Sequence, residues 1–212
     1  MGSHPAHYLA LPVAGQILVQ SDLARTLAAI AEHGPAVFYE GATAAALVAA
    51  VQQAGGLLTP EDLASYRCVW RDPVEGEYRG RHIISMAPPS SGGVHLIQML
   101  NILEGFDLAA AGYGSATAWH LMLEAMKFAY ADRSRFLGDP DFYAVPVAML
   151  TGDDRARQQR ARISPDHALD PAAIEGAART AEPDHSTHFS VVDAAGDAVA
   201  ATLTINLGFG AG

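Results

Sequence analysis

The chain has 212 residues, of which half are hydrophobic and only 17% are charged, so it is expected to be globular, with one large or two small domains. It carries 13 Lys and Arg against 23 Asp and Glu, and the resulting formal net charge of −10 argues against nucleic-acid binding because phosphates would be repelled. No run reaches the roughly 18 apolar residues of a membrane span, and the N-terminus lacks the pattern of a secretory signal peptide.

Three helices are predicted in the first third of the chain. The segment "SDLARTLAAIAEHG" has Ser21 or Asp22 as its N-cap and Gly34 as its stop signal. A second helix, "ATAAALVAAVQQAGG", is closed by its two final glycines. A short third helix follows Thr59, which is a suitable cap, with Pro60 in the first turn.

The composition changes near the single cysteine, Cys68, which cannot form an internal disulfide and is predicted to pack as a small hydrophobe. From Val69 to Met86 the residues are β-branched and aromatic with glycine turns, which predicts two strands around Tyr78-Arg79-Gly80. The following "APPSSGG" opens another helix. Ser90 or Ser91 at its start could bind an anion, although capping after a Pro-Pro turn is the simpler interpretation.

The longest helix is predicted from about Thr117 to Phe136, and an apolar stripe at helical spacing is expected to face the core. The stripe consists of Trp119, Met122, Leu123, Met126 and Tyr130. Residues 152–182 are rich in Arg, Ala and Asp, and they predict a polar helix followed by a linker.

The last segment predicts a β-hairpin. Two β-rich runs flank the loop Ala194-Ala195-Gly196, in which glycine takes the left-handed position. This loop pairs Asp193 with Asp197 and places Ser186 opposite Thr204. The opposite face is expected to be core.

One face of the predicted hairpin is polar. Strand alternation gives it the residues Ser186, His188, Ser190, Thr202, Thr204 and Asn206. A solvated face is one explanation, and a serine nucleophile with hydrogen-bonding neighbours is the other.

Two local site types are disfavoured. A triad of Ser186, His188 and Asp193 is disfavoured because triads form from distant segments. A metal site at Asp184, His185 and His188 is disfavoured because the two histidines face opposite sides of a strand. No metal and no cofactor is therefore predicted.

Five segments together resemble the γ-glutamyltranspeptidase (glutathione hydrolase) family of N-terminal nucleophile hydrolases. They cover nearly everything from about Leu18 to Gly212 in the family's order, and they are "DLARTLAAIAEHGPAVFYEG", "GGLLTPEDLASYR", "YRGRHIISMAPPSSGGVHLIQMLNILEGFD", "FAYADRSRFLGDPDF" and "STHFSVVDAAGDAVAATLTINLGFGAG". The resemblance implies a precursor that cuts itself between His185 and Ser186.

The same resemblance assigns roles to residues. Ser186 stands where the family usually has the Thr nucleophile, Thr204 matches a threonine that hydrogen-bonds it, and Asn206 matches a ligand of the γ-glutamyl group. Serine keeps the attacking oxygen but lacks the methyl that restricts χ1, so slower processing or turnover is expected. The implied partners are a glutathione-like γ-glutamyl donor, an acceptor amino acid or water, and the paired large and small subunits.

The fold class implied is α+β, as an incomplete four-layer αββα sandwich of the N-terminal nucleophile hydrolase type. Residues 1–185 would be the C-terminal part of the large-subunit region, and residues 186–212 the start of the small-subunit region with the nucleophile hairpin. Family residues that grip the substrate carboxylate or stabilise the oxyanion are expected outside this sequence. We therefore expect a piece of a longer chain that is poorly stable and inactive alone.

Two other functions stay open. A cephalosporin (glutaryl) acylase of the same family would use the same nucleophile on a glutaryl amide. A fragment with only a structural or assembly role would be inactive, and Ser186 would then be a sign of decay. The resemblance suggests a periplasmic or secreted protein.

Overall fold

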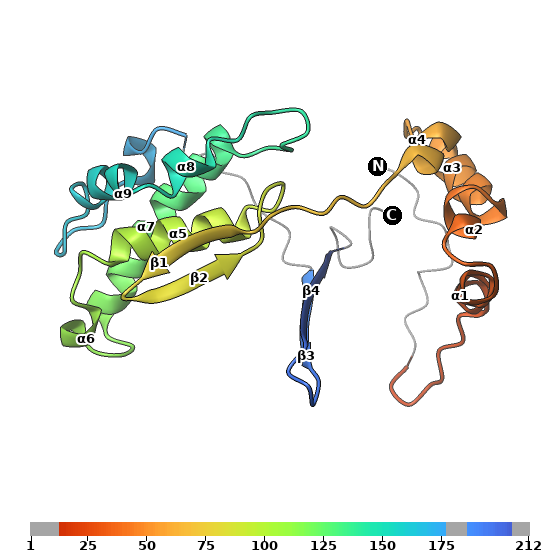
Figure 1. The fold of residues 1–212 in the computed structure, drawn as a ribbon, viewed down its shortest axis with the longest axis horizontal. Helices are drawn as coiled ribbons and strands as arrows, with labels where there is room; N and C mark the ends of the chain where they lie inside the picture. The colour runs from red at the N-terminus through yellow and green to blue at the C-terminus, as the bar shows by residue number, and fades with distance from the viewer. Residues whose placement is uncertain (1–12, 177–185, 205–212) are drawn as a thin grey trace. The chain divides into compact units, whose positions relative to one another are not determined.

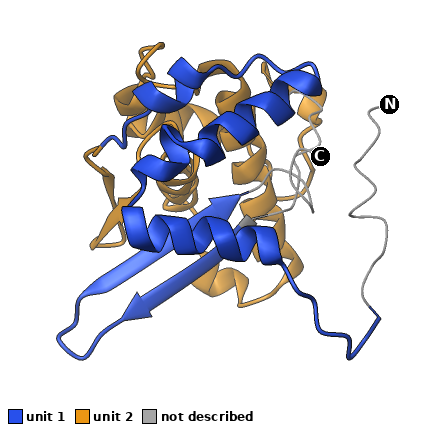
Figure 2. Cartoon of the chain, turned by 90° about the vertical axis from the view of Figure 1, so that its right-hand side faces the viewer, with its two compact units in different colours: residues 1–69, 182–212 blue, residues 70–181 orange. Residues whose placement is uncertain are grey.

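The computed structural model describes residues 13–176 and 186–204 (Figure 1). The chain divides into two compact units, residues 1–69 with 182–212, and residues 70–181 (Figure 2). In its described part the first unit comprises α1 (Ser21–His33), α2 (Ala36–Tyr39), α3 (Ala42–Gln53), α4 (Pro60–Ser65), β3 (Ser186–Val192) and β4 (Ala198–Thr204). The described part of the second unit comprises β1 (Val74–Tyr78), β2 (Arg81–Ser85), α5 (Gly92–Leu103), α6 (Leu108–Ala111), α7 (Ala116–Phe136), α8 (Val147–Leu150), α9 (Asp153–Arg160) and the 3₁₀ turn Pro171–Ala173. This mixture of helices and hairpins confirms the α+β class.

The ends of the early helices follow local chemistry in most places. The Thr59 hydroxyl accepts the Asp62 N–H (3.2 Å), and the Asp62 carboxylate accepts the Thr59 N–H (2.8 Å), which is the capping box of α4. Gly34 ends α1 with φ 79°, as predicted. The predicted cap of α1 was wrong, because Gln20 holds the N-cap position and Ser21 already lies inside the helix without any side-chain cap.

The predicted strands around residues 78–80 form the hairpin β1–β2. Arg79 and Gly80 both have positive φ, 50° and 71°, as a two-residue hairpin turn requires. Two hydrogen bonds stabilise the positive φ of Arg79. Its N–H donates to Glu104 Oε1 (3.0 Å), and its guanidinium donates to the Phe106 carbonyl (3.0 Å). The turn is thereby attached to the end of α5.

Helix α5 is the central element of the second unit, since it contacts β1 and β2 as well as α7 and α9 (Figure 1). Its close approach to the hairpin depends on glycine. A Cβ built on Gly93 would overlap the Met86 carbonyl oxygen and lie 2.6 Å from a methyl of Val74, and a Cβ on Gly76 would lie 2.7 Å from Ile97. The buried residues of the core cluster here are Val74, Val94 and Ile97, together with Leu150 of α8.

Helix α7 buries a different face from the predicted one. Trp119 and Leu123 of the predicted stripe are 56% and 51% exposed, and Met126 and Tyr130 are exposed as well. The buried apolar residues are Ala118, Leu121, Ala125, Phe128, Ala129 and Ala131. The helix carries two apolar stripes at helical spacing, and packing against α5 and α9 selects the one with smaller side chains. Of the predicted stripe, only Met122 packs against the core.

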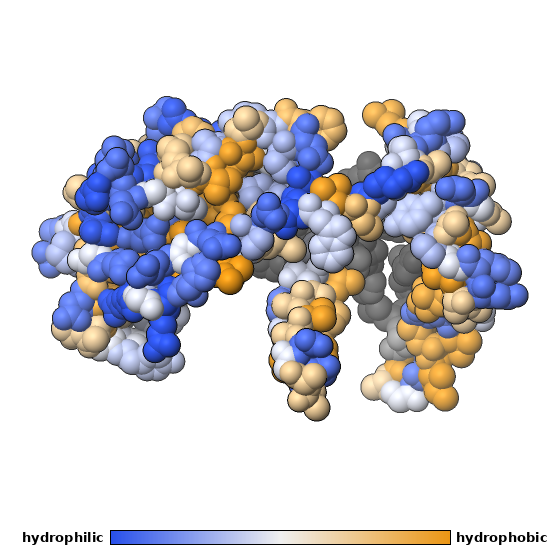
Figure 3. Space-filling view, in the orientation of Figure 1, coloured by the Kyte–Doolittle hydropathy of each residue, from blue (hydrophilic) through white to orange (hydrophobic). Residues whose placement is uncertain are grey.

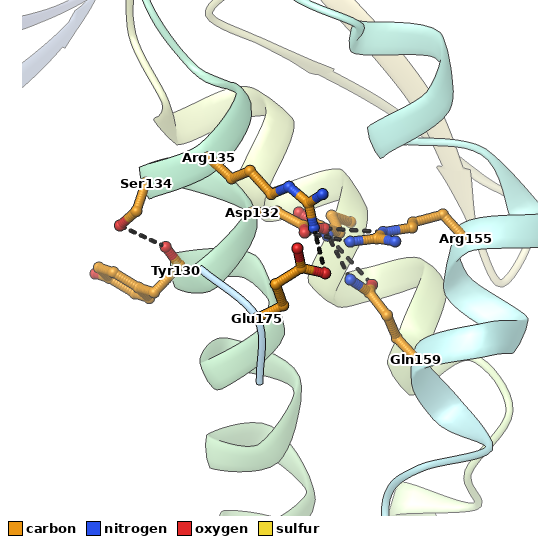
Figure 4. Close-up of polar contacts among 8 residues, drawn as sticks. Tyr130, Asp132, Ser134, Arg135, Arg155, Gln159 and Glu175 are labelled. Atoms are coloured by element: carbon orange, nitrogen blue, oxygen red, sulfur yellow. Dashed lines mark hydrogen bonds and ion pairs between the residues drawn. The ribbon is translucent and has the colours of Figure 1, made fainter. Parts of the chain in front are cut away.

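A buried carboxylate joins three helices of the second unit. Asp132 on α7 is 2% exposed and accepts hydrogen bonds from Gln98 (2.5 Å) and Gln159 (2.8 Å). Arg155 on α9 forms an ion pair with the same carboxylate and donates through Nε at 3.0 Å. Figure 4 shows the Arg155 and Gln159 side chains directed at Asp132, which compensates the burial of its charge.

His95 lies on α5 and is 7% exposed, with its ring centroid 5.5 Å from that of Tyr130. Burial, together with the charge of Arg133, lowers the pKa of His95 to about 4. Its Nε2 has no hydrogen-bond partner among the described residues. The ring is therefore neutral at pH 7 and acts as a packed aromatic group.

Two further observations complete the fold. Cys68 is exposed, so its predicted role as a packed hydrophobe was wrong. Among the helices of residues 13–176 none combines the length and hydrophobicity that a membrane crossing requires.

Candidate active site

The candidate site is built on the hairpin β3–β4, whose loop forms as predicted. Gly196 has φ 91°, its N–H donates to the Asp193 carbonyl (3.2 Å), and the Asp193 N–H donates to the Asp197 carbonyl (3.0 Å). The Asp193 carboxylate accepts the N–H groups of Ala195 and Asp197, each at 2.9 Å. One side chain therefore organises the whole loop, which sets the strand register.

The register agrees with the prediction along its whole length. Ser186 is the first residue of β3 and pairs with Thr204, the last residue of β4. The structure thus brings together two of the predicted site residues on one pair of strands. His185 and Asn206, the other two, lie outside the described residues.

The polar face of the hairpin carries a hydrogen-bonded group that the sequence did not reveal. His188 Nδ1 lies 2.8 Å from Thr202 Oγ1, on the opposite strand, and His188 Nε2 lies 3.3 Å from Ser190 Oγ, on its own strand. Alternation places these residues on one face, but it does not specify side-chain torsions, so only their common face could be predicted.

These contacts bear on the two disfavoured site types. The ring nitrogens of His188 contact Thr202 and Ser190, and the Asp193 carboxylate is occupied by the loop, so His188 and Asp193 form no catalytic pair here. Within the described ranges, no group of three or more His, Cys, Asp and Glu side chains could hold a metal ion.

The opposite face of the hairpin was predicted to be core, and in this chain that prediction is wrong. Val191 and Val199 form a cross-strand pair, yet they are 56% and 61% exposed, and Leu203, four residues further along β4, is also exposed. Figure 3 shows apolar as well as polar residues at the hairpin surface. Both faces of the hairpin are therefore open.

The two serines before α5 differ in their contacts. Ser90 Oγ accepts the Gly92 N–H (3.2 Å), while the Ser91 side chain makes no cap hydrogen bond. A hollow of about 470 Å³ elsewhere in the second unit is lined partly by Trp70, Arg71 and Tyr143. Its arginine is already paired with Asp141 at 2.7 Å, and this hydrogen bond lowers the pKa of Asp141.

Comparison with known proteins identifies the relatives of this chain. A family model described as gamma-glutamyltranspeptidase matches residues 7–212. The glutathione hydrolase proenzyme of Escherichia coli (strain K12) is 49% identical over 199 residues, which are 93% of this chain and 34% of that protein. The acylase ACY 1 proenzyme of Pseudomonas sp. (strain V22) is 46% identical over 197 residues, which are 93% of this chain and 35% of that protein.

A solved structure from the same group of proteins also matches this chain. The gamma-glutamyltranspeptidase of Helicobacter pylori matches with a TM-score of 0.71 and 46% identity, over 81% of this chain and 49% of that one. The chain spans about a third of the length of the curated relatives it matches. Because the family model matches almost the whole sequence, the chain belongs to the gamma-glutamyltranspeptidase family.

Proposed function

We propose that this chain is the part of a γ-glutamyltransferase and glutathione hydrolase precursor that carries the nucleophile, Ser186. The observation that carries the proposal is the backbone register. Ser186, which matches the family's nucleophile position, begins β3 and pairs with Thr204, which matches its hydrogen-bonding threonine. The sequence resemblance and the structure thus support the same pair of residues.

The first step of the proposed chemistry is self-cleavage. Ser186 Oγ attacks the carbonyl carbon of His185, the C–N bond breaks, and an ester to Oγ forms while the nitrogen takes up the hydroxyl proton. Water then hydrolyses the ester, which leaves a carboxylate on His185 and a free α-amino group on Ser186. The two subunits that result stay paired in the proposed enzyme.

The second step is group transfer by the new N-terminal serine. An α-amino group titrates at about 7.7–8.0, so near neutral pH it can accept the proton of its own hydroxyl as a general base. Ser186 Oγ then takes the γ-glutamyl group from a glutathione-like donor and releases the donor's amine. Water or an acceptor amino acid attacks the ester and regenerates the hydroxyl. Asn206 would bind the γ-glutamyl group.

A second candidate function is a cephalosporin (glutaryl) acylase. The specific observation in its favour is the 46% identity to an acylase proenzyme, close to the 49% identity to a glutathione hydrolase proenzyme. Both reactions use the same ester chemistry and differ in the acyl group. A precursor completed to the length of its relatives should be assayed with γ-glutamyl-p-nitroanilide and with a glutaryl amide, and the faster substrate decides.

The proposal also covers the rest of the fold. In the completed protein, residues 1–185 would belong to the large-subunit region and 186–212 to the small-subunit region, within a four-layer αββα sandwich. The exposed apolar face at Val191 and Val199 supports this, since a sandwich layer would cover it. The chain alone is then expected to be inactive. A purely structural fragment is the remaining alternative.

The test is the mass of the completed precursor after incubation. Wild type is expected to yield two pieces that meet between His185 and Ser186, whereas Ser186→Ala should stay intact because no attacking oxygen remains. Ser186→Thr should be cut faster than wild type, since the added methyl restricts χ1.

A matched control lies one residue away. Thr187 carries a hydroxyl but points to the opposite face, where it pairs with Leu203. Thr187→Ala should therefore still be cut. If Ser186→Ala were cut as wild type is, or if wild type were never cut, the proposed nucleophile would be wrong.

A further inference from the structure

The proposed cleavage turns Ser186 from an internal residue into a chain terminus. Before the cut, it lies inside a continuous chain, and afterwards it is the first residue of its strand. Chain ends fray unless contacts hold them, and a nucleophile has to stay in place to react. Ser186 and Thr204 form the terminal pair of the described ladder, and the next pair on the same face, two residues further along β3, can help them to retain the cut end.

That next pair is His188 with Thr202, and it carries a side-chain hydrogen bond between the strands, 2.8 Å from Nδ1 to Oγ1. Backbone hydrogen-bonded pairs alternate along an antiparallel ladder, and Asp193 makes one with Asp197. Even-numbered residues of β3 therefore occupy the other pair type, in which opposite side chains approach most closely. On its other side the ring forms a second hydrogen bond, 3.3 Å from His188 Nε2 to Ser190 Oγ.

The hydrogen-bond partners of His188 are two hydroxyl groups, those of Thr202 and Ser190. Of the described side chains on this face of the hairpin, none is Asp, Glu, Lys or Arg; they are His188, Ser190, Val192, Ala198, Ala200, Thr202 and Thr204. A neutral imidazole offers one N–H and one acceptor nitrogen, so either tautomer can satisfy one hydroxyl by donating and the other by accepting. The imidazole thus links both strands without a salt bridge.

We propose that His188 and Thr202 form a latch that keeps the cut end of β3 paired with β4. His188 is then a positioning residue for Ser186 rather than a group that touches the substrate. The inference rests on the proposed function, because only cleavage creates the end that the latch retains. It follows that the latch matters little for cleavage, when the chain is continuous, and much more for turnover.

The experiment measures both rates in the completed precursor. In Thr202→Val and His188→Gln the cleavage rate, read by intact mass, should stay within about twofold of wild type. Their kcat for γ-glutamyl-p-nitroanilide should fall by about five- to tenfold, the size of one lost hydrogen bond. KM should not change, because the latch residues do not contact substrate and substrate then binds the frayed and the paired forms equally, which leaves their populations unshifted.

A conservative variant of His188 and a double variant show whether the contact with Thr202 is responsible. His188→Asn should keep most of the turnover, since its amide can occupy the Nδ1 position and reach Thr202, whereas the glutamine amide matches Nε2. The double variant His188→Gln with Thr202→Val should be no slower than either single variant, because both remove the same contact.

Two results would overturn the latch alone: equal slowing of cleavage and turnover, which indicates general misfolding, or wild-type turnover in both single variants. A precursor that is never cut between residues 185 and 186 would instead overturn the proposed function, and the latch with it.

Discussion

The two hairpins of this chain have the same antiparallel topology in different surroundings. In β1–β2, Val74 is 7% exposed, because the hairpin packs on α5. In β3–β4, Val191 and Val199 are paired on an apolar face, yet both are more than half exposed. A two-stranded hairpin is marginally stable in water by itself, so β1–β2 draws its stability from α5. The turn sets the register of a hairpin, whereas its stability depends on what covers it.

The largest effect is expected where β1–β2 meets α5. Gly93→Ala should lower the free energy of unfolding of the second unit by about 3 kcal/mol, because the new methyl would overlap the Met86 carbonyl and crowd Val74. Both tryptophans, Trp70 and Trp119, lie in this unit, so urea unfolding followed by tryptophan fluorescence reports on it.

The neighbouring glycine supplies the control for that substitution. A Cβ on Gly92 would meet only Ser90 Oγ, at 3.5 Å, so Gly92→Ala should leave the unfolding midpoint nearly unchanged. Equal destabilisation by the alanines at 92 and 93 would show that the close contact with β1–β2 does not govern stability.

Lowering the pH is expected to have an intermediate effect on the stability of the second unit. The folded pKa of His95, about 4, lies below its ordinary value of 6.5, so between these values the unfolded chain binds a proton that the folded chain does not. The free energy of unfolding should therefore fall as the pH drops below 6.5, by about 2 kcal/mol from this group at pH 5, with no contribution above 6.5.

His95→Gln isolates this contribution. The variant should lose about 2 kcal/mol less than wild type between pH 7 and pH 5, measured by urea unfolding at both values. Identical pH dependence in the two proteins would mean that His95 is not the group responsible.

The smallest effects are expected when the same substitution, Val to Thr, is made in each of the two hairpins. Val74→Thr should lower the free energy of unfolding by about 1.5 kcal/mol, because it buries a hydroxyl of similar size. Val191→Thr should change it by less than about 0.5 kcal/mol in this chain, since that side chain is already in water. In the completed precursor the cost of Val191→Thr should rise, and equal costs in both hairpins of this chain would contradict the comparison.

Features set by neighbouring residues could be predicted from sequence. The cap at Thr59, the turn at Arg79-Gly80 and the loop after Asp193 each depend on contacts across a few positions, and all three formed as expected. For the candidate site, this was enough to pair Ser186 with Thr204.

Features that depend on distant segments could not be predicted. The partners of Asp132 lie 34, 23 and 27 positions away, at Gln98, Arg155 and Gln159, and no local pattern marks them. The buried face of α7 was chosen by α5 and α9 rather than by its largest apolar residues, so Trp119 stayed exposed. The contact of His188 with Thr202 needed side-chain torsions in addition to the correct face.

The loop organised by Asp193 also has a consequence for the order of events in time. Its hydrogen bonds span at most four residues, and such a hairpin can form within about 1–10 μs, before contacts between distant segments. Ser186 and Thr204 can therefore meet early, while the chain around them is still folding. Because the bare hairpin is marginal, that meeting is transient until other segments cover it. We expect the assembly of those segments, rather than strand pairing, to set the moment at which the precursor becomes able to cut itself.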